Sequence, residues 1–151
     1  MRSTLIFAIL GMFVLASGCG DGVKRVPITG LLTCMGEPVD GATLQFIPGP
    51  GVQGEGAIGQ TTAAGRFTVI SSRNRDSGVP AGNYTVRVSR LVDHDGTVLP
   101  SDAAEANYPR SRESIPSPYS GAASPLEAVV PENGGEIKLD IKKKLLVNKK
   151  K

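Results

Sequence analysis

Several residue types are scarce in this 151-residue chain, and each scarcity excludes a class of protein. The chain has no Trp, two Cys and a single His, so no mechanism that needs two imidazoles is available. Its longest uncharged apolar run, residues 5–16, is shorter than the ~20 residues with which a helix crosses a bilayer. A composition of 40% hydrophobic and 21% charged residues argues against both a polytopic membrane protein and a disordered chain.

Glycine and proline are abundant instead. The 19 Gly and 11 Pro make up about a fifth of the chain, against roughly 12% in ordinary globular domains. This density of turn formers excludes a helix bundle or coiled coil and favours short strands joined by turns. Aromatic residues are only 5% of the chain, so the core must be built mainly from Val, Ile and Leu, which suits β-structure.

The first 18 residues have the features of an export signal. Arg2 precedes the apolar run 5–16, which has the length of a signal-peptide core. The stretch Leu15–Ala16–Ser17–Gly18–Cys19 resembles a bacterial lipobox, with Ala16 where Leu is usual. The resemblance implies cleavage before Cys19 and its acylation by several chains, which gives stable membrane anchoring. A buried N-terminal helix is the alternative, but no polar face interrupts the run.

We therefore expect a lipoprotein signal peptide at 1–18 and a lipidated N-terminus with a short tether at 19–23. Gly20 follows the cysteine where Asp would retain a lipoprotein in the inner membrane, so outer-membrane placement is favoured in a diderm cell.

With Cys19 assigned to lipid, Cys34 has no disulfide partner and is interpreted as a small buried hydrophobe. A catalytic thiol would need an activating base, and His94 lies in a distant loop.

Seven segments are predicted as short strands, because apolar residues recur at every second position or turn signals bound them. They are residues 24–34, 43–47, 56–62, 66–70, 83–92, 126–130 and 136–142. The residues expected to face inward are Val26, Ile28, Leu32, Leu44, Phe46, Phe67, Val69, Tyr84, Val86, Val88, Ile137, Leu139 and Ile141. Seven strands in ~120 residues predict an all-β domain over 24–142, a seven-stranded antiparallel β-sandwich with Greek-key connections.

Several turn-and-strand motifs follow one another in a characteristic order. The sequence Gly36-Glu37-Pro38-Val39-x-Gly41-Ala42-Thr43-Leu44-x-Phe46 is followed by Thr61-x-x-x-Gly65-Arg66-Phe67 and then by Pro80-Ala81-Gly82-x-Tyr84-x-Val86-x-Val88. Their order and spacing resemble those of the carboxypeptidase regulatory-like (transthyretin-like) β-sandwich domains, and more narrowly the small lipid-anchored forms of planctomycete-type bacteria. The resemblance covers most of residues 24–142 and implies an Ig-like sandwich. Gly41 and Gly65 are expected at turns that need a positive φ.

A related enzyme fold is not expected to carry its activity here. The transthyretin-like hydrolase of the urate pathway depends on more than one His and on a characteristic C-terminal motif. This chain has only His94 and ends in lysines. We therefore predict no enzymatic activity and no cofactor.

The long connection 93–124 contains the candidate ligand-binding residues. A connection of this length in a compact domain is usually functional or mobile, and only 101–107 is compatible with a short helical turn. Tyr108, Arg110, Arg112 and Tyr119 offer aromatic faces and cationic donors that suit a carbohydrate or an acidic partner surface. In the alternative interpretation Tyr119 packs the loop onto the sandwich and the arginines are in solvent.

Two further patterns receive a structural interpretation. Asp93-His94-Asp95-Gly96 has the alternating acids of a calcium loop but lacks the downstream Glu of an EF-hand, so we interpret it as a hairpin tip and predict no metal site. An isopeptide bond between Lys24 and Asp140, on the two end strands, is conceivable, but both positions read as solvent-facing.

The C-terminus is basic. Lys142, Lys143, Lys144 and Lys149–Lys151 follow a region, 19–141, with ten basic and fourteen acidic residues. A nucleic-acid partner is therefore not expected. Residues 143–151 are interpreted as a solvated basic tail that contacts anionic headgroups or polymers.

These features together predict a lipid-anchored envelope lipoprotein that acts as a non-enzymatic structural or protein-binding module. Its partners would be the membrane, through Cys19, and an envelope protein or polysaccharide. The oligomeric state is left open. A carbohydrate-binding module that uses the 93–124 loop is the alternative.

Overall fold

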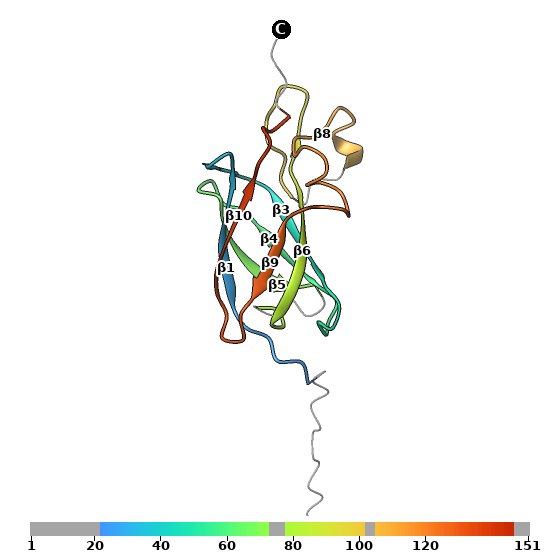
Figure 1. Cartoon of the computed structure of the whole chain (residues 1–151). Coiled ribbons are helices and arrows are strands. Elements are labelled where there is room, and N and C mark those ends of the chain that lie inside the picture. The colour runs from blue at the N-terminus through green and yellow to red at the C-terminus, as the bar shows by residue number, and fades with distance from the viewer. Residues whose placement is uncertain (1–21, 73–77, 102–104, 147–151) are drawn as a thin grey trace, which may run out of the picture.

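The computed structural model describes residues 22–72, 78–101 and 105–146, and this part of the chain is all-β (Figure 1). Apart from one 3-10 turn, η1 (Glu105–Asn107), its elements are strands: β1 (Ile28–Cys34), β2 (Glu37–Pro38), β3 (Thr43–Pro48), β4 (Ala57–Gln60), β5 (Arg66–Ser71), β6 (Gly82–Ser89), β7 (Leu91–Val92), β8 (Arg112–Glu113), β9 (Glu127–Val130) and β10 (Gly135–Ile141). Among these residues no helix is long and apolar enough to span a membrane. The predicted signal peptide and Cys19 lie outside the described residues.

The seven predicted strands are confirmed, each by one of the seven longer strands. Every residue expected to face inward is at most 9% exposed, so the period-two phase of each strand is also confirmed. The predicted boundaries agree with the observed ones to within two residues, with two exceptions. Regular pairing in the first strand begins only at Ile28, and the predicted strand 83–92 is interrupted at Arg90, between β6 and β7.

The longer strands form one curled sheet in the order β10-β1-β5-β4-β3-β6-β9. Neighbours are antiparallel except β1 and β10, which pair in parallel from Ile28↔Gly135 to Cys34↔Ile141. In this pair the structure differs from the predicted all-antiparallel arrangement. Turn signals in a sequence indicate only that two consecutive strands are connected, whereas β1 and β10 are the first and last strands of the domain. Parallel partners need a long connection, which here is the rest of the domain.

Curling of the sheet brings the inward faces of its two halves onto one core. Phe46 on β3 lies between Phe67 on β5 and Tyr84 on β6, with ring centroids 6.1 Å apart in both pairs. The tilted and edge-on geometries are those that aromatic pairs prefer. Around these rings pack the Val, Ile and Leu side chains of β1, β6 and β10.

Two glycines make room for the Phe67 ring. A Cβ on Gly30 would lie 2.3 Å from Phe67 Cζ and 2.4 Å from the Ile137 carbonyl oxygen, and one on Gly59 would lie 3.3 Å from Phe67 Cδ2. The ring therefore fills the space that the absent side chains leave. The predicted positive φ is also present at the turns, at 61° for Gly41 and 71° for Gly65.

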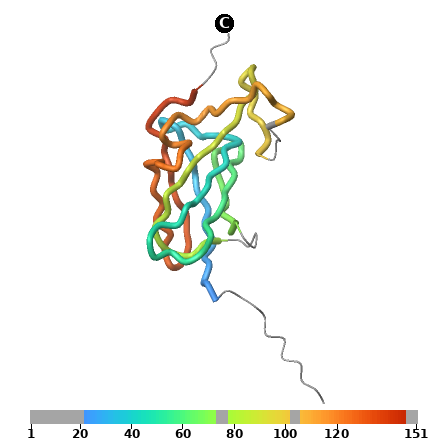
Figure 2. The backbone as a smooth tube through the Cα atoms, turned by 90° about the vertical axis from the view of Figure 1, so that its right-hand side faces the viewer, coloured from blue at the N-terminus to red at the C-terminus, as the bar shows by residue number. Residues whose placement is uncertain are grey.

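The strand directions divide the loops between two ends of the sheet, seen in Figures 1 and 2. The proximal end holds the incoming segment 22–27 and the turns 49–56 and 131–134. The distal end holds the turns 35–42 and 61–65, most of the long connection, and residues 142–146. Because β1 and β10 are parallel, the chain enters at the proximal end and leaves at the distal end.

Replacing Gly30 with Ala should lower the free energy of unfolding by about 2 kcal/mol, because the new methyl group collides with the Phe67 ring and with a backbone carbonyl. Urea denaturation measures the loss. Gly121→Ala is the matched control, since its Cβ would meet only the Pro118 carbonyl oxygen at 3.4 Å. Equal stability of the two variants would contradict this account of the core.

Candidate functional site

Most of the predicted 93–124 loop is built onto the distal end of the sheet. Its β8 strand pairs with β7, and the Ser114 amide donates to the Arg90 carbonyl at 2.9 Å. Further along, Val88 N–H donates to Tyr119 O at 3.0 Å, and the Ser124 hydroxyl donates to Val86 O at 2.6 Å. The described part of this connection is therefore a fixed layer with its own hydrogen bonds to β6.

The four candidate ligand-binding residues do not share one environment. Tyr119 is only 7% exposed and belongs to the core, and its hydroxyl oxygen accepts the Lys142 amide at 3.2 Å. Tyr108 is half-buried, whereas Arg110 and Arg112 are exposed. Tyr119 therefore packs the loop against the sheet and presents no open ring face. Ligand binding through Tyr108, Arg110 and Arg112 stays a prediction.

Arg90 is the centre of a polar network beneath this layer. Its side chain is 13% exposed and its guanidinium donates three hydrogen bonds: Nε to Asp40 O at 2.7 Å, Nη2 to Asp40 Oδ1 at 2.7 Å, and Nη1 to Ser114 Oγ at 3.2 Å. The planar fork of arginine matches this set of acceptors. The network joins the turn before β3 to the end of β6 and to the long connection.

Glu113 completes the network from the other side. Its carboxylate accepts the Ser89 hydroxyl at 2.6 Å, the Arg90 amide at 2.9 Å and the Ile115 amide at 2.8 Å. These bonds satisfy the backbone groups that are left unpaired where the strand breaks at Arg90. A buried side-chain N or O atom without a partner is not found among the described residues.

The Arg90 network was not anticipated from the sequence, although one signal pointed to it. Every second residue from Tyr84 through Val86 and Val88 faces inward, and the next position in this alternation is Arg90. The strand pattern therefore predicts that this arginine faces the core. A charge at an inward position needs partners. The partners turn out to be Asp40 and Glu113. Asp40 lies in a turn and Glu113 in a segment without periodicity, so no sequence pattern indicates that they bind Arg90.

A second polar cluster fixes the exit of β10. Asp140 Oδ1 accepts the Thr33 hydroxyl at 2.6 Å and the Gly36 amide at 3.1 Å, while Oδ2 pairs with Lys142 Nζ at 2.6 Å. The hydrogen bonds from Lys142 and Thr33 lower the pKa of Asp140 to about 2. This carboxylate therefore holds the β1–β2 turn against the end of the last strand.

The first residues of the predicted basic tail are packed on the domain. Leu145 packs against the core, and the Leu146 amide donates to Ser114 O at 2.7 Å. The Lys143 carbonyl accepts a hydrogen bond from the Cys34 thiol at 3.0 Å. The Lys143 ammonium Nζ donates to Ser117 O at 3.0 Å. Cys34 is buried as predicted, and burial raises the pKa of its thiol. The folded domain thus extends to residue 146, and of the predicted tail the residues 147–151 lie outside the described part of the chain.

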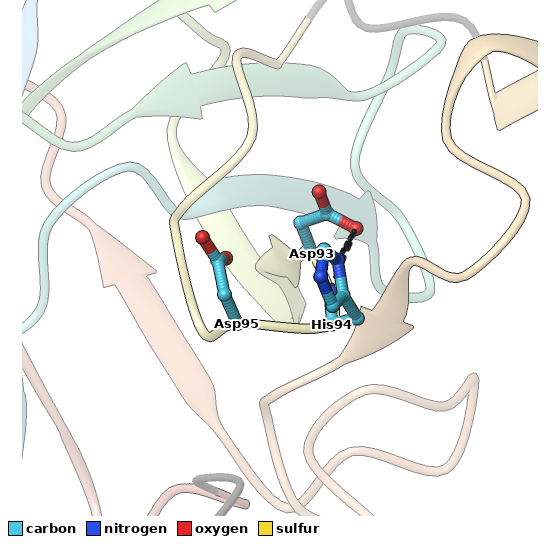
Figure 3. Close-up of side chains that lie close together, drawn as sticks. All are labelled: Asp93, His94 and Asp95. Carbon is cyan, nitrogen blue, oxygen red and sulfur yellow. Dashed lines mark hydrogen bonds and ion pairs between the residues drawn. The ribbon is translucent and has the colours of Figure 1, made fainter. Parts of the chain in front are cut away.

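Asp93, His94 and Asp95 form the tip of a hairpin at the distal end (Figure 3). Their candidate ligand atoms lie within 4.8 Å of one another. The carboxylates already serve the turn, because Asp93 Oδ1 accepts the His94 amide at 2.7 Å and Asp95 Oδ1 accepts the Thr97 amide at 2.9 Å. These amide bonds lower the pKa of both acids. The geometry is that of the predicted hairpin tip.

The structure separates Lys24 from Asp140. Asp140 pairs in register with Thr33, nine residues after Lys24, which is about 30 Å along an extended chain. This separation excludes an isopeptide bond between Lys24 and Asp140. The two residues belong to neighbouring strand regions but to opposite ends of the sheet.

A groove on the outward face of the sheet is not lined by any of the four candidate ligand-binding residues. It has a volume of about 580 Å³ and crosses β1, β5, β4 and β3. Threonines at 29, 43 and 68 line it together with Ile58, which is 41% exposed, and Arg66, which pairs with Glu136 at 3.2 Å. The face combines hydroxyl groups with an apolar patch.

Replacing Arg90 with Lys should lower the free energy of unfolding by about 1–2 kcal/mol, because an ammonium cannot serve three acceptors arranged around a planar fork. Hydrogen exchange in the peptide covering 105–121 should accelerate as well. Arg87→Lys is the control, since Arg87 is exposed and makes one side-chain hydrogen bond, to Ser120 O. Equal effects of the two substitutions would contradict the central place of Arg90.

Asp140→Asn should destabilise the domain by about 1–2 kcal/mol at neutral pH, after a discount for partial exposure of this carboxylate. Its folded-state pKa of about 2 lies below the ordinary 3.8. The stabilisation is therefore present above pH ~4 and is lost as the pH falls towards ~2. Urea denaturation of both proteins between neutral and acid pH measures the gap. A gap that does not narrow in acid would contradict the assignment, and Glu136→Gln on the same strand is the control.

Comparison of the chain with known protein families, curated proteins and solved structures finds no match. The resemblance to carboxypeptidase regulatory-like domains therefore stays a prediction, and the chain is described by its all-β fold and by the residues that build its two ends.

Proposed function

We propose that the protein is an exported lipoprotein, anchored by acylated Cys19 in the outer membrane, which acts as a non-enzymatic structural or protein-binding module. The observation that carries the proposal is the separation of the two ends of the sheet. Gly22, the first described residue, is three residues after Cys19, a reach of about 11 Å. An acylated Cys19 would hold the proximal end close to the bilayer and leave the distal end facing the compartment.

The same proposal assigns the curled sheet to the Ig-like, transthyretin-like sandwiches. Two observations support this assignment. The inner faces of the β10-β1-β5 half and the β4-β3-β6-β9 half contribute to one core. The Tyr84 hydroxyl donates to Pro80 O at 2.8 Å, four residues upstream, which is the arrangement of the tyrosine corner in Greek-key sandwiches.

The distal end is suited to present a surface of fixed shape to a partner. Arg90 and Glu113 hold the long connection on the sheet, and Tyr119 packs it from beneath. Binding residues commonly occupy loops that a rigid scaffold positions. Exposed Arg110 and Arg112 on this layer are the groups that an acidic protein surface would meet.

Replacing Cys19 with Ser should move the protein from the membrane to the soluble fraction of cells, because the acylated thiol is the proposed anchor. Fractionation and the mass of the mature N-terminal peptide are the measurements. Cys34→Ser is the matched control. The Cys34 thiol is buried in β1 and donates to a backbone carbonyl, a bond that a hydroxyl can also make, so this variant should stay in the membrane fraction. Retention of the Cys19→Ser protein in the membrane would overturn the anchor.

A further inference from the structure

A row of polar side chains crosses the strands on the outward face of the sheet. Thr29 of β1 lies opposite Thr68 of β5. Thr43 of β3 lies opposite Gln60 of β4 on one side and opposite Ser89 of β6 on the other. Continuing the β4–β5 register by one step brings Gln60 opposite Thr68. These five residues form the polar row, which spans about 19 Å over five strands at the usual ~4.8 Å between neighbours.

Two cavities follow one another along the polar row. The groove of about 580 Å³ is lined by four of its members, those on β1, β5, β4 and β3. A second cavity of about 210 Å³ is lined by Thr43 and Ser89, so Thr43 belongs to both. The larger volume is in the range of small-ligand sites. Its continuation past Thr43 towards β6 favours a linear ligand over a compact one.

The polar row offers groups that both donate and accept hydrogen bonds, the hydroxyls of Thr and Ser and the amide of Gln. Among the described residues no hydrogen-bond partner is found for the side chains on β1, β5, β4 and β3. The Ser89 hydroxyl is the exception, because it donates to Glu113 Oε2 at 2.6 Å. Four neighbouring strands therefore present open hydrogen-bonding groups to a ligand.

An aliphatic strip runs beside the polar row. Ile58 of β4 and Ile70 of β5 lie opposite each other, two residues nearer the proximal end than Gln60 and Thr68. Both line the larger cavity, and Ile58 is 41% exposed. A ligand on the row would meet hydrogen-bonding groups and, next to them, an apolar surface. Sugar rings have the matching chemistry, with hydroxyls around the rim and C–H groups on the faces.

The charge of the groove argues against an anionic ligand. Arg66 is the one charged side chain among the described residues that line the two cavities. Its Nη1 pairs with Glu136 Oε1 at 3.2 Å, so its charge is balanced. The one aromatic ring in the described lining, that of Phe67, is only 3% exposed. Nucleic acids are bound by several cations and by open aromatic faces, and this lining offers neither.

The position of the polar row argues against an added peptide strand. A peptide that extends a sheet gains its main-chain hydrogen bonds at a free edge. The edge strands of this sheet are β9 and β10. The polar row instead crosses β1, β5, β4, β3 and β6, each of which has a paired neighbour on both sides. Recognition on this face therefore depends on side chains.

We propose that the polar row and the two isoleucines beside it bind a linear, neutral polysaccharide laid across the strands. The hydroxyl and amide groups would bond to the hydroxyls of successive sugar units, while Ile58 and Ile70 contact the C–H faces of the rings. The site contains none of the four candidate ligand-binding residues of the long connection. It goes beyond the proposed function and needs neither the lipid anchor nor the distal partner surface.

The binding is tested by biolayer interferometry on the full-length chain with Cys19→Ser, using immobilised cello-oligosaccharide, xylan and mannan as probes. At least one of these neutral polymers should bind. Added salt should leave the binding unchanged, because the ligand has no charge to screen. Failure of all three polymers to bind, or binding that salt abolishes, would overturn the inference.

The site is tested by removing single groups from the polar row. Thr68→Val keeps the β-branched shape and should weaken binding about fivefold, the effect of one net hydrogen bond. Gln60→Ala on the neighbouring strand should act in the same way. Thr85→Val is the matched control, since Thr85 alternates with buried residues on β6 but lines neither cavity. Thermal unfolding verifies that each variant is folded, and equal losses in Thr68→Val and Thr85→Val would overturn the assignment.

The extended form of the site is tested with oligomers of whichever polymer binds. Affinity should rise from the disaccharide to the hexasaccharide, because longer chains reach more of the five strands. Equal affinities would contradict a linear site. Sedimentation of the chain without saccharide tests a second copy as the occupant. Thr68→Val should leave the sedimentation unchanged, and a dimer that this substitution dissociates would overturn the inference.

Discussion

The parallel pairing of β1 with β10 is the constraint on which the rest of the structure depends. It joins the first and last strands of the domain, so this pair requires the chain between them to return the last strand to the side of the first. It also determines the two ends of the molecule, because a parallel pair carries the entry and the exit of the chain to opposite sides. An antiparallel pair in the same place would bring them together.

The distal end is stabilised by polar groups rather than by a larger core. Arg90 interrupts a regular strand, where its amide donates to Glu113 in place of a ladder partner and its side chain bonds to Asp40 and Ser114. Asp140 performs a similar task at the end of β10, where it joins the β1–β2 turn to the exit of the chain. Both clusters act where strands stop, which is where backbone groups need side-chain partners.

Strand positions and facing were predictable from the sequence because they are local properties. The alternation in Tyr84, Val86 and Val88 requires only a pleated chain with one buried face. Strand order was not predictable, because no feature of residues 28–34 indicates that they pair with residues 135–141. The Arg90 network depends on the same non-local folding. Its arginine was visible at an inward position, but Asp40 and Glu113 reach it only once the turn and the long connection are in place.

The central claim is that the chain enters and leaves the domain at opposite ends. The most direct test is pulsed electron paramagnetic resonance on spin labels at Lys24→Cys and Lys144→Cys, in a chain whose two native cysteines are replaced by Ser. Both positions are exposed. The parallel pair predicts a separation of about 30 Å or more, from the length of β1 and the residues that precede it. A separation of about 15 Å or less would place both ends on one side of the sheet and contradict the account.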